Sequence, residues 1–208
     1  MKKFFVQGKS NKSHVNSVEK RRIIFRFWKF LNEDTWQSWL VRLVLAFVLI
    51  KFVFFPIMSI VTGSPLPLVV VESCSMYHST NFNSWWDQNG LWYEDRGITK
   101  QNFEDFSFNG GLNKGDIVLV YNRGKYKLGD IIIFKSDYLH PIIHRIIDEN
   151  NLQTKGDHNS RQLSIEKKIN ENQVLGKAVA RVPGLGWLKL IFFEGTKPPE
   201  ERGFCKSN

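Results

Sequence analysis

The chain has 208 residues, 42% of them hydrophobic, and a formal net charge of +9, which suits one globular domain with appendages. The charge is uneven: residues 1–42 hold 10 Lys and Arg against 3 Asp and Glu, whereas residues 43–208 hold 19 against 17. A basic arm on a nearly neutral body, with no zinc-finger or RNA-recognition motif, argues against a nucleic-acid-binding protein.

Residues 43–61 form an apolar run, LVLAFVLIKFVFFPIMSIV, interrupted by one charged residue, Lys51. A helix of this length roughly spans a hydrocarbon core of about 30 Å. The alternative is a buried core helix, which Lys51 and Pro56 favour. One central lysine costs about 3 kcal/mol on insertion scales, and the surrounding apolar side chains offset it. We therefore expect a transmembrane anchor, and the run lies too far into the chain for a cleaved signal peptide.

The charges on either side of the run predict its orientation. KRRIIFRFWK at 20–29 and Arg42 precede it, whereas the uncharged VTGSPLPL at 61–68 follows it. The positive-inside rule then makes residues 1–42 a basic cytoplasmic arm and residues 62–208 a domain outside the cytoplasm.

Short strands dominate the sequence after residue 113. Runs of β-branched residues, separated by turn residues, lie at 116–121, 130–134, 141–147, 152–156 and 174–182. No 3.6-residue periodicity long enough for a major helix appears among them. We expect a mainly β domain, either a coiled sheet or a partly open barrel.

Residues 80–110 differ in composition from these strands and are predicted to form an inserted, aromatic-rich subdomain. They carry Trp85, Trp86, Trp92 and Tyr93 among acids and amides. A flexible linker would not need three tryptophans, so the first expectation is a small satellite core. The alternative is an aromatic patch that touches the bilayer or a substrate.

The two cysteines, Cys74 and Cys205, do not make a disulfide framework, and nothing in the sequence requires a bridge between them. Cys74 adjoins Ser75, so a thiol nucleophile is an alternative to the serine. On an extended strand, however, Cys74 would face away from Ser73 and Ser75.

The segment VESCSMYH at 71–78 raises the question of a serine nucleophile, which needs a base. His144 lies within PIIHRII, where a lone histidine is usually a core residue. With His140 it gives H-x3-H, but Pro141 and the isoleucines favour a strand over a metal-binding helix, so no metal or cofactor is expected. In TKGDHN at 154–159, Asp157 either makes an Asx-type turn or orients His144, as in a catalytic triad.

Four ordered blocks resemble signal peptidase I, in its archaeal and endoplasmic-reticulum branch. They are VVVESCSMYHS at 69–79, NKGDIVLV at 113–120, KLGDIIIFKSDYLHPIIHRII at 127–147 and LQTKGDHN at 152–159. The blocks follow an N-terminal anchor and cover roughly half of the chain. The resemblance implies a signal-peptidase-like sheet with a Ser-His catalytic pair.

The resemblance also implies residue roles. Ser75 matches the nucleophile, His144 the general base and Asp157 the acidic residue of the Gly-Asp-Asn block. Ser73 matches the serine that helps hold the oxyanion, with the Ser75 backbone N–H as second donor. On a strand these two serines would face the same way.

The chain departs from the family pattern at three places. Tyr77-His78-Ser79 replaces x-Pro-Thr, the 80–110 insertion follows, and Leu163 stands where relatives carry a second acid. The orienting acid is therefore Asp157 or Glu166.

These observations predict a membrane-anchored serine endopeptidase that removes signal peptides after small residues. It would cross the cell membrane once, and its partners would be signal peptides, the lipid bilayer and the protein-export machinery. Two alternatives stay open. One is a catalytically inactive, membrane-tethered module that binds extended peptides. The other is a Ser-Lys peptidase that uses Lys135 or Lys155 as base.

Overall fold

The computed structural model describes residues 11–138 and 140–206, and the chain divides into two compact units, Met1–Pro56 and Ile57–Asn208. The first ten residues of the predicted basic arm lie outside the described residues. Helix α1 (Asn11–Leu31) contains KRRIIFRFWK, the strongly basic part of this arm.

A continuous apolar helix runs from Trp36 to Thr62, 27 residues that are long and apolar enough to cross a membrane. It comprises α2 (Trp36–Leu49), the π-helical turn η1 (Ile50–Phe54) and α3 (Phe55–Thr62). The helix begins earlier than the predicted run because Thr35 caps its first turn, accepting a hydrogen bond from the Ser38 amide. The π-helical turn lies just before Pro56, which has no N–H to donate.

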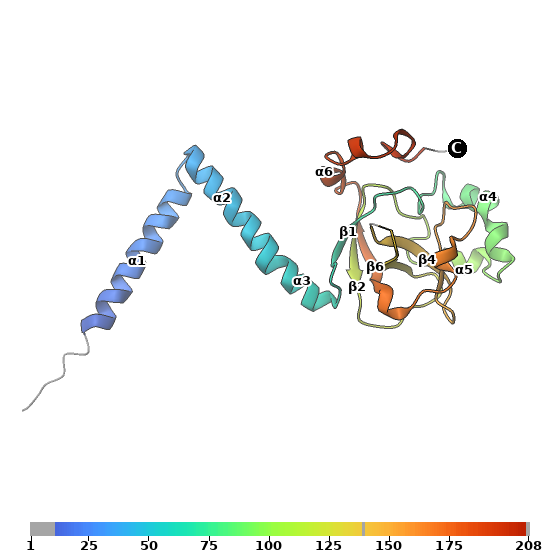
Figure 1. The fold of residues 1–208 in the computed structure, drawn as a ribbon, viewed down its shortest axis with the longest axis horizontal. Coiled ribbons are helices and arrows are strands. Elements are labelled where there is room, and N and C mark those ends of the chain that lie inside the picture. The colour runs from blue at the N-terminus through green and yellow to red at the C-terminus, as the bar shows by residue number, and fades with distance from the viewer. Residues whose placement is uncertain (1–10, 139, 207–208) are drawn as a thin grey trace, which may run out of the picture. The chain divides into compact units, whose positions relative to one another are not determined.

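The second unit is built on one antiparallel sheet of six strands in the order β1-β2-β6-β3-β4-β5 (Figure 1). The strands are β1 (Leu68–Val70), β2 (Ile117–Tyr121), β3 (Ile131–Phe134), β4 (Ile142–Asp148), β5 (Gln153–Lys155) and β6 (Val174–Val182). Register shifts interrupt three of the pairings, and such bulges bend and twist a sheet. The predicted strands and the curled mainly β fold are confirmed.

Apolar side chains cover both faces of this sheet, so the sequence of its inner strand β3 is a continuous run of apolar residues. All four residues of β3 are buried. One face packs Val118, Val120, Ile131, Ile133 and Ile143 together. The other face packs Ile132, Phe134, Ile146, Leu152 and Val174. Because successive side chains of a strand point to opposite faces, odd and even residues of β3 and β4 enter different cores.

The helical insertion, residues 80–110, forms α4 (Phe82–Glu94) and α5 (Lys100–Glu104), which lie beside β4 (Figure 1). Its aromatic residues build a separate core in which Trp85, Tyr93 and Phe103 are almost fully buried against Ile147 of β4. The prediction of a satellite core is confirmed. Burial of these rings argues against the alternative of an aromatic patch that is exposed to lipid or substrate.

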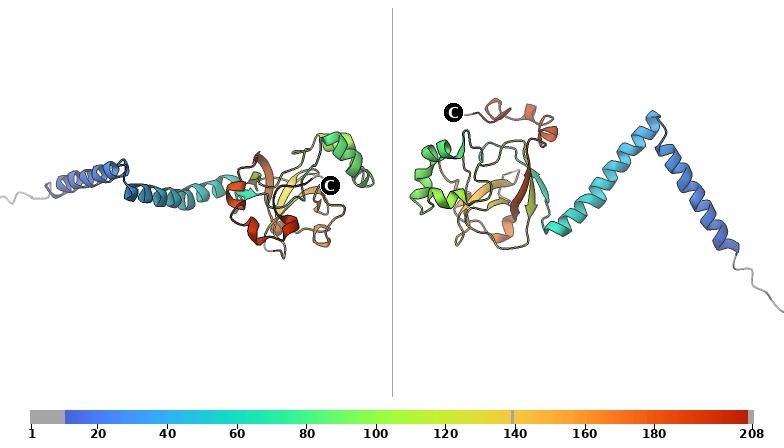
Figure 2. Two further views of the ribbon diagram at one scale, coloured as in Figure 1. Left: turned by 90° about the horizontal axis from the view of Figure 1, so that it is seen from above. Right: turned by 180° about the vertical axis from the view of Figure 1, so that it is seen from behind.

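Two 3-10 turns, η2 (Ser164–Glu166) and η3 (Glu171–Gln173), connect β5 to β6. After β6 the chain forms α6 (Trp187–Leu190), η4 (Glu194–Thr196) and η5 (Pro199–Glu201), which lie outside the sheet (Figure 2). A disulfide joins Cys74 to Cys205, with their Cα atoms 5.6 Å apart. The sequence did not require this bridge, and because Cys74 is disulfide-bonded it has no thiol to serve as nucleophile.

Candidate active site

The segment that carries Ser73 and Ser75 is a turn. The expectation that the two serines lie on a strand is therefore wrong. Strand β1 ends at Val70. The Val71 amide donates a hydrogen bond to the Asp116 carbonyl at 2.8 Å. The chain then bends, with the Tyr77 amide donating to the Cys74 carbonyl at 3.0 Å. The two hydroxyls still meet, since Ser73 Oγ lies 3.1 Å from Ser75 Oγ.

The turn, residues 72–77, will be called the nucleophile turn, and neighbouring backbone holds it in place. The His158 amide donates to the Ser75 carbonyl and the Leu112 amide to the Met76 carbonyl, both at 2.8 Å. The Met76 side chain is buried in the sheet core. Ser75 is half-buried, which leaves its hydroxyl within reach of a substrate.

His144 lies in the middle of β4 and is paired with a carboxylate. Its Nδ1 is hydrogen-bonded to Oε1 of Glu166, in η2. Glu166 is fully buried and also accepts hydrogen bonds from Thr154 Oγ1 at 3.1 Å and from the Leu163 amide at 2.7 Å. With Nδ1–H donating to the carboxylate, Nε2 of the neutral imidazole is left as an acceptor.

That acceptor nitrogen lies next to the nucleophile turn. A Cβ built on Gly156 would come 2.7 Å from His144 Nε2 and 2.8 Å from the Ser75 carbonyl oxygen, so both groups converge on this glycine. Any side chain at residue 156 would separate them. Among the described residues no hydrogen bond joins Ser75 Oγ to His144 Nε2, as is common before a substrate closes such a site.

Asp157 does not contact His144, which corrects the prediction that it orients this histidine. Its carboxylate receives Arg145 Nη2 at 2.7 Å, His78 Nε2 at 3.0 Å and the Tyr93 hydroxyl at 3.3 Å. His144 and Arg145 are consecutive on β4, so their side chains point to opposite faces of the sheet. Since Asp157 pairs with Arg145, it lies on the face away from the His144 ring.

His78 and Tyr93 were not predicted as parts of the site. His78 is buried and its ring stacks on Trp85 with centroids 3.7 Å apart, so it ties the helical insertion to Asp157. The only sequence signals were the replacement of x-Pro-Thr by a histidine-containing triplet and the aromatic composition of the insertion.

The buried cluster around Asp157 shifts the pKa values of Asp157 and Tyr93. Burial opposes the charged form of Asp157, but Arg145 and His78 outweigh it and hold the pKa of this carboxyl below its usual range. Burial, together with the neighbouring Asp157 charge, raises the pKa of Tyr93 well above its ordinary value. The Asp157 carboxyl is therefore ionised throughout the neutral range.

The two lysines considered as alternative bases lie in different surroundings. Lys155 is buried in β5, with Nζ 3.4 Å from the Tyr93 hydroxyl and 4.9 Å from the centre of the Trp92 ring. Burial lowers its pKa to about 8. Its ammonium therefore belongs to the Asp157 face, away from His144 Nε2. Lys135 is exposed just after β3.

The spacing that suggested a metal site brings no pair of ligands together. His140 is exposed and lies 3.8 Å from Glu72, whereas His144 is bonded to Glu166. Within residues 11–138 and 140–206, no group of three His, Cys, Asp or Glu side chains is placed to hold a metal ion.

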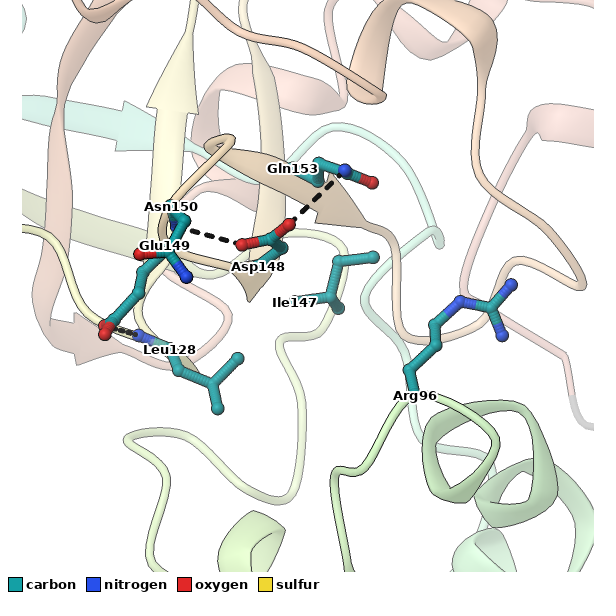
Figure 3. Close-up of a pocket in the computed structure, with 7 residues that line it drawn as sticks. All are labelled: Arg96, Leu128, Ile147, Asp148, Glu149, Asn150 and Gln153. Carbon is teal, nitrogen blue, oxygen red and sulfur yellow. Dashed lines mark hydrogen bonds between the residues drawn. The ribbon is translucent and has the colours of Figure 1, made fainter.

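A cavity of about 480 Å³ lies between the helical insertion and the β4–β5 hairpin. Figure 3 shows Arg96 across its opening from Asp148, which accepts hydrogen bonds from the Asn150 amide and the Gln153 side chain. The rest of its lining comprises Leu128, Ile147 and Glu149. None of these residues belongs to the Ser75–His144 site, so the cavity is separate from the candidate catalytic groups.

Comparisons with known proteins agree with the motifs. No family model matches the sequence. The sequence is 29% identical over 168 residues to the signal peptidase complex catalytic subunit SEC11 of Zygosaccharomyces rouxii, covering 73% of this chain and 81% of that protein. It is 28% identical over 159 residues to SEC11 of Lachancea thermotolerans, covering 69% and 76%. For SEC11 of Eremothecium gossypii the identity is 26% over 160 residues, covering 69% and 75%.

These similarities, together with the apolar helix Trp36–Thr62, indicate a membrane protein. They also confirm the resemblance drawn from the four sequence blocks. The chain is a homologue of the signal peptidase complex catalytic subunits, the endoplasmic-reticulum-type branch of signal peptidase I.

Proposed function

We propose that this chain is a membrane-anchored serine endopeptidase that removes signal peptides from exported proteins. One observation carries the proposal: His144 Nε2 and the Ser75 carbonyl converge on Gly156, while a buried carboxylate holds Nδ1 of the same ring. A hydroxyl, a correctly oriented imidazole and an acid are the groups that acyl transfer requires.

In this mechanism Nε2 of His144 takes the proton of Ser75 Oγ as the oxygen attacks the scissile carbonyl. The oxyanion of the tetrahedral intermediate is stabilised by the Ser75 backbone N–H and by Ser73 Oγ, which lies 3.1 Å from the attacking oxygen. His144 then gives its proton to the leaving amine. Water, deprotonated by the same nitrogen, hydrolyses the acyl-enzyme and regenerates Ser75.

Glu166 is the orienting acid in this proposal, in place of Asp157. Its three hydrogen bonds fix the carboxylate, and the one to His144 Nδ1 stabilises the imidazolium that forms during the reaction. Asp157 acts on the site only indirectly, through the loop that follows β5. It anchors the loop whose next residue, His158, holds the Ser75 carbonyl.

We further propose that Trp36–Thr62 spans the cell membrane once, with the basic N-terminal arm in the cytoplasm and the peptidase domain outside. The positive charges before the helix support this orientation. The Cys74–Cys205 disulfide adds independent support, because disulfides persist mainly on the oxidising side of a membrane. The anchor would keep the site near the bilayer and the export machinery, where signal peptides emerge.

The test is cleavage of a model pre-protein by the detergent-solubilised full chain, compared with Ser75→Ala and His144→Ala. The proposal expects cleavage after a small residue by the parent and a loss of roughly 10⁴-fold or more in both variants. Activity retained in His144→Ala would instead favour a lysine base. A parent that binds the peptide without cutting it would favour the inactive binding module.

A further inference from the structure

The C-terminal segment, residues 187–206, is bound to the nucleophile turn by a covalent bond. Cys74, which stands between Ser73 and Ser75, forms the disulfide with Cys205 at a sequence separation of 131. Both cysteines are half-buried rather than sealed in a core, so a small thiol can reach the bond.

Two lysines of the same segment bind the beginning of the turn. Lys189 Nζ donates to Glu72 Oε1, and Lys197 Nζ donates to the Glu72 backbone carbonyl, each at 2.8 Å. Glu72 lies three residues before Ser75. The segment thus holds the turn at two residues, at Glu72 through the two lysines and at Cys74 through the disulfide.

The segment is itself well braced, so it can act as a fixed support. The nearly buried Lys114 ammonium donates to Glu194 Oε2 at 2.8 Å and to the Glu201 carbonyl at 2.6 Å. The Trp187 and Phe204 rings are in contact, with centroids 4.6 Å apart. Lys114 thus connects the segment to the body of the domain, and the ring contact joins the two ends of the segment to each other.

The other side of the nucleophile turn is held by main-chain hydrogen bonds from His158 and Leu112 and by the buried side chain of Met76. A turn has few internal hydrogen bonds to fix its shape, yet the Ser75 N–H and the two serine oxygens must be aligned with a developing oxyanion. A displacement of about 1 Å in such a group can cost on the order of a hundredfold in rate.

We propose that the C-terminal segment is a strap that positions Ser75, and that the Cys74–Cys205 disulfide makes catalysis depend on the redox state. This inference rests on the proposed peptidase function. Cys205 and Lys189 are positioning residues in it, since they act on Ser75 only through the turn. Reduction by a dithiol transfers two electrons and two protons to the cysteine sulfurs, breaking the S–S bond into two thiols while the dithiol closes to a cyclic disulfide.

The experiment compares the oxidised full chain in detergent with the same protein after dithiothreitol treatment and alkylation, with Cys205→Ser as the matched variant. We expect kcat to fall by roughly ten- to a hundredfold on reduction while KM changes little. Cys205→Ser should show the lower rate and no response to dithiothreitol. Reoxidation of the unalkylated, reduced parent with glutathione disulfide should restore its rate, a reversal that general unfolding would not give.

Amide hydrogen exchange provides a readout that does not need cleavage. Exchange at residues 72–77 should rise on reduction, measured at a temperature where the reduced domain stays folded, because loss of the cross-link also lowers the stability of the whole domain. If the oxidised parent fails to cleave, the peptidase proposal fails, and the exchange at this turn still decides whether the strap exists. Unchanged exchange, a fully alkylated parent that cleaves at the oxidised rate, or free thiols in the untreated protein would each overturn the inference.

Discussion

The two faces of β4 show how consecutive residues of one strand, His144 and Arg145, can pair with carboxylates that have different roles. On one face His144 is bonded to Glu166, and its second nitrogen lies beside the nucleophile turn. On the other face Asp157 is shared by Arg145, His78 and Tyr93. A histidine next to a carboxylate is therefore not enough to identify a base, since its free nitrogen must also reach the nucleophile.

The partners of the two carboxylates explain the difference. Asp157 neutralises Arg145, whose side chain is fully buried and whose remaining N–H groups donate to the Ser107, Phe108 and Gly129 carbonyls. Glu166 is held by a hydroxyl, an amide and an imidazole, none of which carries a permanent charge. The first arrangement stabilises the fold, and the second is suited to stabilising a cation that appears only during a reaction.

Removing the structural carboxylate should produce the largest loss of stability. Asp157→Ala leaves the buried Arg145 guanidinium without its counter-charge, and we expect the free energy of unfolding to fall by about 3–5 kcal/mol. Urea unfolding followed by fluorescence measures it. Asp87→Ala, which removes an exposed carboxylate of α4, should stay within about 0.5 kcal/mol of the parent. Equal effects of the two changes would contradict the assignment.

Ser73→Ala tests the proposed oxyanion donor on the His144 face. Loss of one oxyanion donor should lower kcat by roughly 10²–10³-fold with little change in KM or stability. Steady-state cleavage of the model pre-protein measures both constants. Ser79→Ala, in the same region, is the control and should keep the parent rate. A Ser73→Ala variant with the parent kcat would remove this residue from the mechanism.

Lys155, on the Asp157 face of the sheet, should make the free energy of unfolding depend on pH in the alkaline range. Burial lowers the pKa of Lys155 to about 8, whereas an unfolded lysine titrates near pH 10.4, so the unfolded state binds more protons between these values. Stability should therefore rise from pH 8 to 10, by on the order of 2 kcal/mol. Lys155→Met should abolish the rise, and Lys135→Met, at an exposed lysine, should keep it. A parent whose unfolding free energy is flat over this range would argue against a buried, charged Lys155.

Much of the fold follows from the sequence because its signals are local. The β-branched runs separated by turn residues predicted β2 to β6 closely, since apolar strands that are buried on both faces are recognisable as short continuous stretches. The apolar helix was recognised from its length and composition. Its earlier start depends on one capping hydroxyl, that of Thr35, which a hydropathy argument does not consider.

The partners within the site were harder to predict because they depend on how loops fold. Asp157 and Glu166 lie in the same connection after β5, and both were considered. Only the path of the chain brings η2 under His144 while it turns Asp157 toward Arg145. The disulfide was missed for the same reason, because the pairing of Cys74 with Cys205 depends on a C-terminal segment that has no strong pattern of its own.

Whether Glu166 or Asp157 orients His144 is decided by comparing Glu166→Gln with Asp157→Asn. Cleavage of the model pre-protein would be measured at a temperature where both variants are folded. We expect Glu166→Gln to lose about 10⁴-fold in kcat, and Asp157→Asn to stay within about tenfold of the parent. The reverse order, with Asp157→Asn inactive and Glu166→Gln near the parent rate, would show that Asp157 and not Glu166 orients His144.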